Sequence, residues 1–386
     1  MPGVLTEERP VRHMEADWLP RPTLSGRDYA SPAVYDEERE RIWFDGWVCI
    51  GRSEEIAKPG DYLVRDVVGE SVIVTRNRGS GVRAFYNVCA HRGTRILDDE
   101  PDCGHVNKVF KCPYHSWSYD LDGQLVGTPN VHEDERFERS GHPLHAIAAD
   151  EYAGFVFVSM ETEPKPLPVA LRASVETITD FDRYGMDELR IGARLAYEVK
   201  ANWKIVVENY NECLHCPTVH PELVSVIPLY RYGEVWDGET RDGGNLMRDD
   251  VTSFTIAGTS DLPRLPDLLP EDYHMYYGAF QFPNLMINLH PDAVMYYILY
   301  PRAVDHTTVV SEFLFRPETI ASAGFKPDPV VELWDIVSRQ DWSVCERAQI
   351  GVSSRAYTGG VYPRKDRLLF DFNEHWRAEM GRPLVG

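Results

Sequence analysis

Four residues in the first third of the chain carry side chains that bind metals. Cys89 and His91 are separated by one residue, and Cys112 and His115, separated by two, follow after an interval of 20 residues. Two thiolates can hold one iron of a [2Fe–2S] cluster while two imidazoles hold the other, and this mixture raises the reduction potential above that of an all-thiolate cluster. The spacing therefore predicts a one-electron acceptor in this part of the chain.

A zinc ion is the alternative occupant of these four ligands, because structural zinc accepts two Cys and two His at short spacings. The residues that follow favour iron and sulfur. Asp122-Gly123 predicts a β-hairpin between Tyr119–Leu121 and Gln124–Val126, rather than the helix of a zinc finger. We therefore predict a Rieske-type [2Fe–2S] cluster, with a zinc-binding module as the alternative.

A second group of polar side chains lies in a helical pattern between residues 202 and 220. At about 100° per residue, the apolar side chains form one face, and the opposite face carries Glu208, Asn211, Glu212 and His215. A polar face of this kind is most often solvated, so the pattern alone leaves a purely structural helix open.

The end of this helix gives its polar face a second interpretation. We expect Pro217 to stop the helix near Cys216, because proline cannot continue a hydrogen-bonded helix. The turn beyond it can bring His220 beside His215. Two converging imidazoles suit iron, copper or zinc.

A helix predicted from Val330 to Gln349 supplies a carboxylate. Its outer face is charged, whereas Asp341 lies opposite, among the apolar residues Trp334, Val337, Val344, Cys345 and Ala348. Burying an unpaired carboxylate is costly, and either an arginine or a metal ion would remove that cost. Two histidines with Asp341 make the 2-His-1-carboxylate triad, which leaves positions on Fe(II) open for O2 and substrate.

Length and charge limit the fold and the partners. The chain has 386 residues, more than one domain usually holds, and its formal net charge of −21 disfavours nucleic acid and anionic membranes. Without a signal peptide or a membrane-spanning apolar run, its seven cysteines predict a reducing, cytoplasmic location. The five cysteines outside the cluster motif are expected to be unpaired, buried apolar residues: Cys49, Cys103, Cys213, Cys216 and Cys345.

The order of the predicted elements suggests where the chain divides. A short helix is predicted from Ser31, with Pro32 at its first position, and strand-like runs follow from about residue 47 to residue 160. The proline-rich segment Glu163–Pro168 cannot continue a strand or a helix, so it marks the expected boundary. The remainder is mixed α and β.

With both sites in place, the chain resembles the catalytic (alpha) subunit of Rieske non-heme iron oxygenases. The resemblance rests on Cys89–Gly93, Cys112–Trp117, Glu208–His220 and Gln340–Trp342. It implies an α+β fold, with a Rieske β-sandwich domain and a helix-grip (START-like) catalytic domain built on an antiparallel sheet. The implied boundaries are an N-terminal segment at 1–46 that packs on the catalytic domain, a Rieske domain at 47–160, and a mononuclear iron domain at 161–386.

The resemblance also implies a role for each site residue. The cluster ligands would be Cys89, His91, Cys112 and His115, and the Fe(II) ligands His215, His220 and Asp341. A head-to-tail homotrimer would set the cluster of one subunit opposite the iron of its neighbour, and Glu212 would carry the electron between them by bridging to a cluster histidine, His115. Many members of the family have Asp at this position, so Glu212 departs from the commonest pattern.

Finer details resemble the branch that oxidises quaternary ammonium compounds such as glycine betaine, stachydrine and carnitine. They lie around His215 and in Ser353–Gly360. An aromatic cage would hold a methylated cation. The candidates lie on strand-like runs, where aromatic residues more often fill a core: Tyr276, Tyr277, Phe280, Phe282, Tyr296 and Tyr297.

The expected reaction is a hydroxylation that uses O2 and electrons from NAD(P)H. A separate flavin or ferredoxin-type reductase would deliver the electrons, because the chain has no Gly-x-Gly-x-x-Gly dinucleotide fingerprint of its own. If an N-methyl group is hydroxylated, formaldehyde is released and the net result is demethylation. The alternatives are aromatic-ring dihydroxylation and a plain Rieske electron carrier, which would leave Asp341 unexplained.

Overall fold

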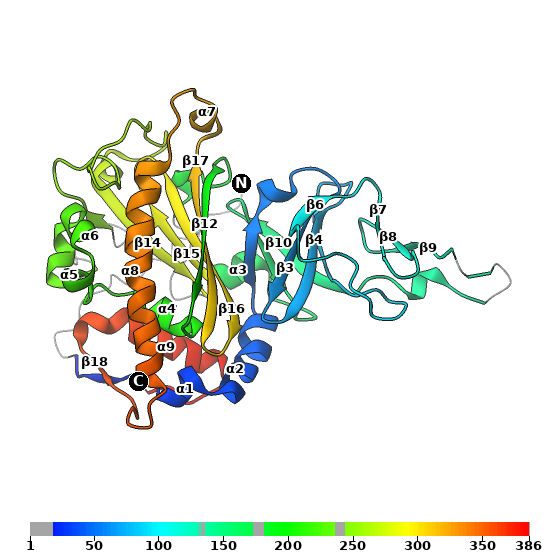
Figure 1. The fold of residues 1–386 in the computed structure, drawn as a ribbon, viewed down its shortest axis with the longest axis horizontal. Coiled ribbons are helices and arrows are strands. Elements are labelled where there is room, and N and C mark those ends of the chain that lie inside the picture. Colours follow the sequence, from blue (N-terminus) through cyan, green and yellow to red (C-terminus); the bar gives the residue numbers. More distant parts are fainter. Residues whose placement is uncertain (1–17, 130, 133–135, 173–180, 236–243, 386) are drawn as a thin grey trace.

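The computed structural model describes residues 18–129, 131–132, 136–172, 181–235 and 244–385, and Figure 1 shows its fold. The helices are α1 (Gly26–Ala30), α2 (Pro32–Glu38), α3 (Leu167–Arg172), α4 (Trp203–Tyr210), α5 (Cys216–Val219), α6 (Pro221–Val226), α7 (Pro317–Ile320), α8 (Asp328–Val352) and α9 (Arg367–Glu379). Among the described residues, no helix is both long and apolar enough to cross a membrane.

The strands are short in the first half of the chain and longer in the second. They are β1 (Arg21–Pro22), β2 (Val48–Arg52), β3 (Asp61–Val67), β4 (Glu70–Arg76), β5 (Val82–Tyr86), β6 (Cys103–His105), β7 (Val109–Lys111), β8 (Ser118–Asp120), β9 (Leu125–Gly127), β10 (Ala146–Tyr152), β11 (Phe155–Ser159), β12 (Arg190–Val199), β13 (Asn245–Leu246), β14 (Met275–Gln281), β15 (Leu285–Leu289), β16 (Val294–Ala303), β17 (His306–Phe315) and β18 (Val361–Tyr362).

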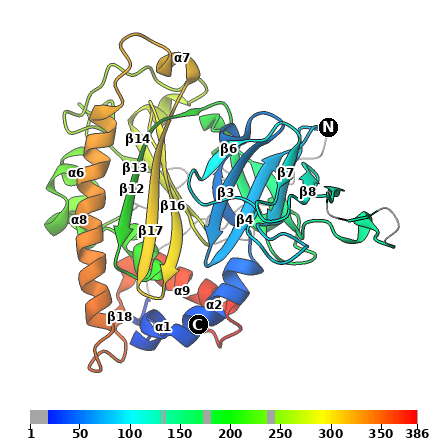
Figure 2. The same cartoon turned by 45° about the vertical axis from the view of Figure 1, so that its right-hand side comes forward.

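The first half of the described chain folds around a seven-stranded sheet. Its strands lie in the order β2-β11-β10-β5-β4-β3-β6, and a three-stranded sheet, β7-β8-β9, lies beyond it (Figures 1 and 2). Cys89 and His91 follow β5, and Cys112 and His115 lie between β7 and β8. The predicted hairpin at Asp122-Gly123 is confirmed, because β8 and β9 pair antiparallel and Gly123 takes the positive φ of 78° that the turn requires.

A six-stranded antiparallel sheet organises the second half, with its strands in the order β12-β17-β16-β15-β14-β13. The long helix α8 lies across one face, and the seven-stranded sheet packs toward the other (Figures 1 and 2). Alternate residues of β16 reach these two layers. Tyr297 is hydrogen-bonded to Ser338 of α8 at 2.7 Å, whereas Tyr300 donates to the Ile50 carbonyl of β2 at 3.1 Å. The expected α+β class with an antiparallel catalytic sheet is confirmed.

A buried carboxylate joins the start of the described chain to this second layer. Glu38, at the end of α2, accepts hydrogen bonds from Lys204 Nζ at 2.5 Å, from Trp203 Nε1 at 3.0 Å and from Trp376 Nε1 at 2.8 Å. The Lys204 ammonium also lies over the rings of Tyr29, Trp203 and Trp376. Residues 18–46 therefore pack on α4 and α9, while the exact domain boundaries near residues 46 and 160 remain predictions.

The predicted helices are confirmed in two places and wrong in one. Ser31 and Pro32 begin α2 as expected, and α8 contains the whole predicted segment. The helix expected to continue to Cys216 instead ends at Tyr210, and Pro217 lies in the first turn of α5, where its missing N–H costs nothing. Helical periodicity therefore does not set the direction of the side chains beyond Tyr210.

A local hydrogen bond explains the early end of α4. The Glu212 carboxylate accepts from the backbone N–H groups of Leu214 and His215, so this stretch is a turn rather than a further helical turn. The structure also joins Cys213 and Cys216 by a disulfide, and Cys103 is exposed. The expectation of unpaired, buried cysteines is therefore wrong for these three residues. It holds for Cys49 and Cys345.

Replacing Lys204 by methionine should strongly destabilise the fold, because it would leave the Glu38 carboxylate buried without a counter-charge. We expect Lys204→Met to lower the free energy of unfolding by about 3–5 kcal/mol, measured by urea denaturation. The matched control is Lys200→Met, because Lys200 is exposed and its replacement should change that free energy by less than about 0.5 kcal/mol. Equal effects of the two substitutions would contradict the role given to the Glu38 pair.

Candidate metal centres

Two loops bring the four residues of the cluster motif together. The thiols of Cys89 and Cys112 are both buried, and the ring centroids of His91 and His115 lie 4.7 Å apart. Burial raises the pKa of Cys89, as does the neighbouring Cys112 thiol. The structure thus pairs the two thiols with each other and the two imidazoles with each other, as a mixed-ligand [2Fe–2S] cluster requires.

The surroundings of these ligands fit a cluster. The Tyr119 hydroxyl lies 3.2 Å from Cys89 Sγ and accepts a hydrogen bond from the Ala90 N–H at 3.0 Å. Hydrogen bonds to cluster sulfurs tune the reduction potential. Within the described chain, His115 Nδ1 is buried and has no hydrogen-bond partner, which leaves its lone pair available to an iron. These observations support the cluster assignment, which remains a proposal for the individual ligands.

The second site brings three ligand atoms to one point. His215 Nε2 lies 3.1 Å from His220 Nε2, and Asp341 Oδ1 lies 3.2 Å from the first and 2.8 Å from the second. His215 comes from the turn after α4, His220 lies between α5 and α6, and Asp341 projects from the middle of α8. The arginine considered as an alternative partner is not needed, because the two histidines face this carboxylate.

The outer nitrogens of both rings are held by acceptors. His215 Nδ1 lies 2.5 Å from Glu212 Oε1, and His220 Nδ1 lies 2.7 Å from Gln340 Oε1. These contacts place the proton of each neutral imidazole on Nδ1, so both Nε2 lone pairs point toward Asp341. Three converging acceptors repel one another unless a cation lies between them. The donor set therefore fits a divalent metal such as Fe(II).

The pKa shifts of His215 and Asp341 in the metal-free site also indicate that positive charge is stabilised there. Burial lowers the pKa of His215, but its hydrogen bonds to Asp341 and Glu212 outweigh burial and raise that pKa to about 10. Burial raises the pKa of Asp341, yet the hydrogen bonds from His215 and His220 hold it below its usual range. Glu212 and Asp341 thus favour a proton on His215 when no metal is present. A metal ion bound beside Asp341 would supply that positive charge instead.

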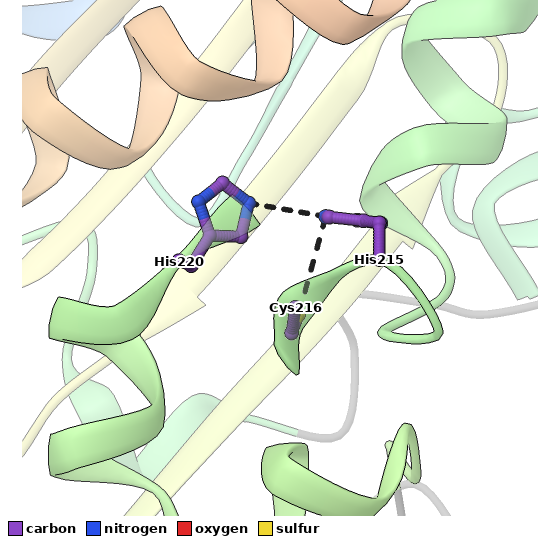
Figure 3. Close-up of side chains that lie close together, drawn as sticks. All are labelled: His215, Cys216 and His220. Atoms are coloured by element: carbon purple, nitrogen blue, oxygen red, sulfur yellow. Dashed lines mark hydrogen bonds between the residues drawn. The ribbon is translucent and has the colours of Figure 1, made fainter. Parts of the chain in front are cut away.

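Figure 3 shows that a sulfur lies near this point as well. Cys216 Sγ is 4.0 Å from His215 Nε2. Because the disulfide with Cys213 uses this sulfur, no thiolate is available there in the described structure. Asp341 is therefore the better candidate for the third ligand.

The aromatic residues proposed for a substrate cage fall into three groups. Tyr276 stacks on Phe254 at a centroid distance of 5.1 Å, on the α8 side of the sheet. Phe280 and Phe282 instead pack against Phe372 of α9, where they fill the core around Trp203.

The third group lies on the far face of the sheet. Tyr296 packs against Phe155 of β11 and donates a hydrogen bond to Glu312, and Tyr277 donates to Asp272 at 2.7 Å. The structure thus places Tyr296 away from the histidines, because successive residues of a strand point to opposite faces. Its neighbour Tyr297 faces α8, and the charge of Asp341 is one of the causes, after burial, that raise the Tyr297 pKa.

Several residues of the site escaped the sequence interpretation. The motif Gln340–Trp342 assigns no role to Gln340, yet its side chain holds His220, and its position beside Asp341 on one helix is the signal that could have revealed this role. The apolar pattern of this helix predicts only packing for Trp334, although it lies two turns before Asp341 on the same helical face. Phe254 and His290 lie outside any periodic pattern, so no signal in the sequence pointed to them.

The cluster loops and the histidine pair lie at opposite ends of the molecule. Figure 1 shows β7, β8 and β9 at one end and α5 and α6 at the other, and Figure 2 preserves this separation after rotation. A single chain therefore holds two candidate metal sites that do not adjoin each other.

Comparison with known families identifies the fold and the enzyme class. The profile of the ring-hydroxylating alpha subunit (catalytic domain) matches residues 186–382, and that of the Rieske [2Fe-2S] domain matches residues 46–147. The chain belongs to the ring-hydroxylating alpha-subunit family. It is therefore a Rieske non-heme iron oxygenase, with a [2Fe–2S] cluster and a mononuclear iron as cofactors, which excludes the plain electron carrier and the zinc module.

Curated relatives of this Rieske oxygenase span nearly the whole chain. It is 29% identical to the carnitine monooxygenase oxygenase subunit of Acinetobacter baumannii, over 90% of each chain. It is also 29% identical to the glycine betaine monooxygenase oxygenase subunit of Chromohalobacter salexigens, over 87% of this chain and 80% of that one.

A solved structure agrees with these relatives. The structure of a quaternary ammonium Rieske monooxygenase, described as giving insights into carnitine oxidation by gut microbiota and inter-subunit electron transfer, superposes with a TM-score of 0.70 at 26% identity. The match covers 88% of each chain.

Removing Asp341 should empty the mononuclear site and spare the cluster. We expect Asp341→Ala to lower the iron content from about three to about two atoms per chain, because one of three ligands is lost, while the cluster EPR signal is kept. Iron analysis and EPR of the same sample measure both. Asp335→Ala is the matched control on α8, since Asp335 binds Tyr197 and Arg339 rather than the histidines. Full iron content in Asp341→Ala would remove it from the ligand set.

Proposed function

We propose that this oxygenase hydroxylates an N-methyl group of a small quaternary ammonium compound and so demethylates it. The observation that carries the proposal is the convergence of His215 Nε2, His220 Nε2 and Asp341 Oδ1 within 3.2 Å of one another, with aromatic rings along the same face of α8. Relatives that act on carnitine and glycine betaine support this substrate class.

Aromatic side chains near Asp341 offer faces for a methylated cation. Tyr297 contacts both Trp334 and Trp342, at centroid distances of 6.4 and 5.8 Å, and Tyr276 lies 6.2 Å from Trp334. A quaternary ammonium group is held by such ring faces because their quadrupole attracts positive charge without a hydrogen bond. We therefore assign the cage to Tyr276, Tyr297 and Trp334 in place of Phe280, Phe282 and Tyr296.

With its metals bound, the enzyme couples electron delivery through the cluster to O2 activation at the iron. The balance is one substrate, one O2, two electrons and two protons, giving the hydroxymethyl product and water. The C–N bond of that product then breaks, its electron pair stays on nitrogen, and formaldehyde leaves with loss of a proton. The electrons come from NAD(P)H through a separate reductase, and the net charge of −21 favours a basic docking surface on that partner.

We further propose that Glu212 passes electrons into the iron site from another subunit. Its side chain is 14% exposed, and Oε1 directly contacts the ligand His215 at 2.5 Å. The cluster loops lie at the opposite end of the same chain, which supports delivery of electrons from the cluster of a neighbouring subunit. We assign Glu212 as the bridge to the cluster of that neighbour in a head-to-tail homotrimer.

The function is tested by a single turnover without any reductase. The anaerobic, reduced holoenzyme is mixed with O2 and one of carnitine, glycine betaine or an aromatic acid, and the products are measured by mass spectrometry. We expect formaldehyde and the demethylated amine from a quaternary ammonium compound. Ring diols, or no product from any quaternary ammonium compound despite full iron content, would contradict the proposal.

Replacing Glu212 by glutamine should separate electron transfer from metal binding. The amide can still accept from His215 Nδ1, so Glu212→Gln should keep both metals, yet the loss of the bridging charge should slow cluster oxidation in a single turnover at least about tenfold. Stopped-flow absorbance follows that oxidation. Glu346→Gln is the control, because Glu346 contacts the Lys200 N–H and not the site. An unchanged rate would argue against the bridge.

A further inference from the structure

A stack of four rings lies buried between α8 and the sheet. Phe254 is almost parallel to His290, with an interplanar angle of 3° and centroids 4.6 Å apart, and it also stacks on Tyr276 and Trp334 at 5.1 and 5.0 Å. His290 lies just after β15 and is 0% exposed. His290 is thus a polar side chain in a cluster of aromatic rings. The proposed oxidation reaction gives His290 no role.

The proton of the His290 ring can be located from its partner. Burial alone lowers the pKa of His290 to about 3, so the imidazole is neutral and carries one proton. The indole N–H of Trp334 donates to His290 Nε2 at 3.2 Å. Since Nε2 accepts, the proton is on Nδ1, which is therefore a hydrogen-bond donor.

This donor has nothing to bind among the described residues. His290 Nδ1 is buried and has no hydrogen-bond partner there. A buried donor without an acceptor is unfavourable, and such groups in native proteins usually mark a bound water, an ion or a ligand. The proton cannot move to Nε2 instead, because the Trp334 N–H would then face another N–H.

The stack is connected to the iron site along α8. Trp334 and Asp341 are seven residues apart, which puts them on the same helical face at a distance of about 10 Å along the axis. Tyr297 lies between them, in contact with Trp334 at 6.4 Å and hydrogen-bonded to Ser338. The side chains on this face therefore form a continuous series of contacts from His290, through Trp334 and Tyr297, to the part of α8 that carries Asp341.

We propose that His290 is a specificity-determining residue, whose Nδ1–H donates a hydrogen bond to a carboxylate oxygen at the end of the substrate remote from its ammonium group. This inference rests on the proposed function and narrows it to zwitterionic substrates. The ammonium end lies toward Asp341, against the rings of Tyr297 and Trp334, where its methyl groups face the site of oxidation. The carboxylate end satisfies the one unpaired donor of the stack.

The test compares ligands that share the ammonium group and differ in the acceptor. Dissociation constants of glycine betaine, carnitine and tetramethylammonium are measured by anaerobic calorimetry on the iron-loaded holoenzyme. His290→Phe keeps a flat ring in the stack but removes the donor. We expect the ratio of the zwitterion Kd to the tetramethylammonium Kd to rise roughly 10- to 100-fold in His290→Phe, the range for a hydrogen bond to a charged group.

Two further variants separate this role from a structural one. His290→Asn places an amide N–H close to the position of Nδ1, so it should recover part of the ratio. Trp334→Phe removes the donor that fixes the tautomer and keeps His290 in place, so it should raise the ratio by a smaller factor. Trp334→Phe also serves as the test if His290→Phe does not fold, as judged from its cluster EPR signal and iron content.

The outcomes distinguish failure of this inference from failure of the proposed function. If the wild type binds and demethylates a zwitterion but the ratio stays within twofold in every variant, the role of His290 is wrong and the function stands. If all ligands weaken equally, His290 is a packing residue. If the wild type binds none of the three ligands, both proposals fall.

Discussion

The ion pair between Glu38 and Lys204 is the constraint on which the remaining structure depends. It lies wholly inside the protein, so neither charge is tolerated there without the other. Its hydrogen bonds and ring contacts tie α2, α4 and α9 into one unit, and α4 leads directly into the turn that carries His215. The Glu38–Lys204 pair therefore helps to set the position of the iron site relative to the sheet, although it involves none of the candidate iron ligands.

The site itself is organised by acceptors more than by donors. Glu212 and Gln340 orient the two imidazoles from outside, and Asp341 closes the arrangement from α8. Two segments far apart in sequence meet here: His215 and His220 lie on a turn and a helix junction only five residues apart, and Asp341 comes from the long helix α8. The residues that hold the candidate iron ligands are therefore distinct from the aromatic residues farther along α8 that we propose as the substrate cage.

Sequence patterns predicted what depends on local spacing and missed what depends on packing. The ligand types and the helix around Asp341 followed from short motifs and from a 3.6-residue period. The end of α4 could not be predicted in this way, because the Glu212 carboxylate accepts hydrogen bonds from backbone N–H groups that a continuing helix would use. Alternation along β16 shows that Tyr296 and Tyr297 face opposite ways but cannot show which one faces α8, and His290 became visible only through its tertiary neighbours.

The separation of the two metal sites within one chain has a genetic consequence. If each iron is served by the cluster of a neighbour, the catalytic unit is an interface rather than a polypeptide. A chain with a defective cluster and a chain with a defective iron site are then both inactive alone, yet a mixed assembly contains interfaces at which an intact cluster meets an intact iron. Two null alleles of such a gene would complement each other when expressed in one cell.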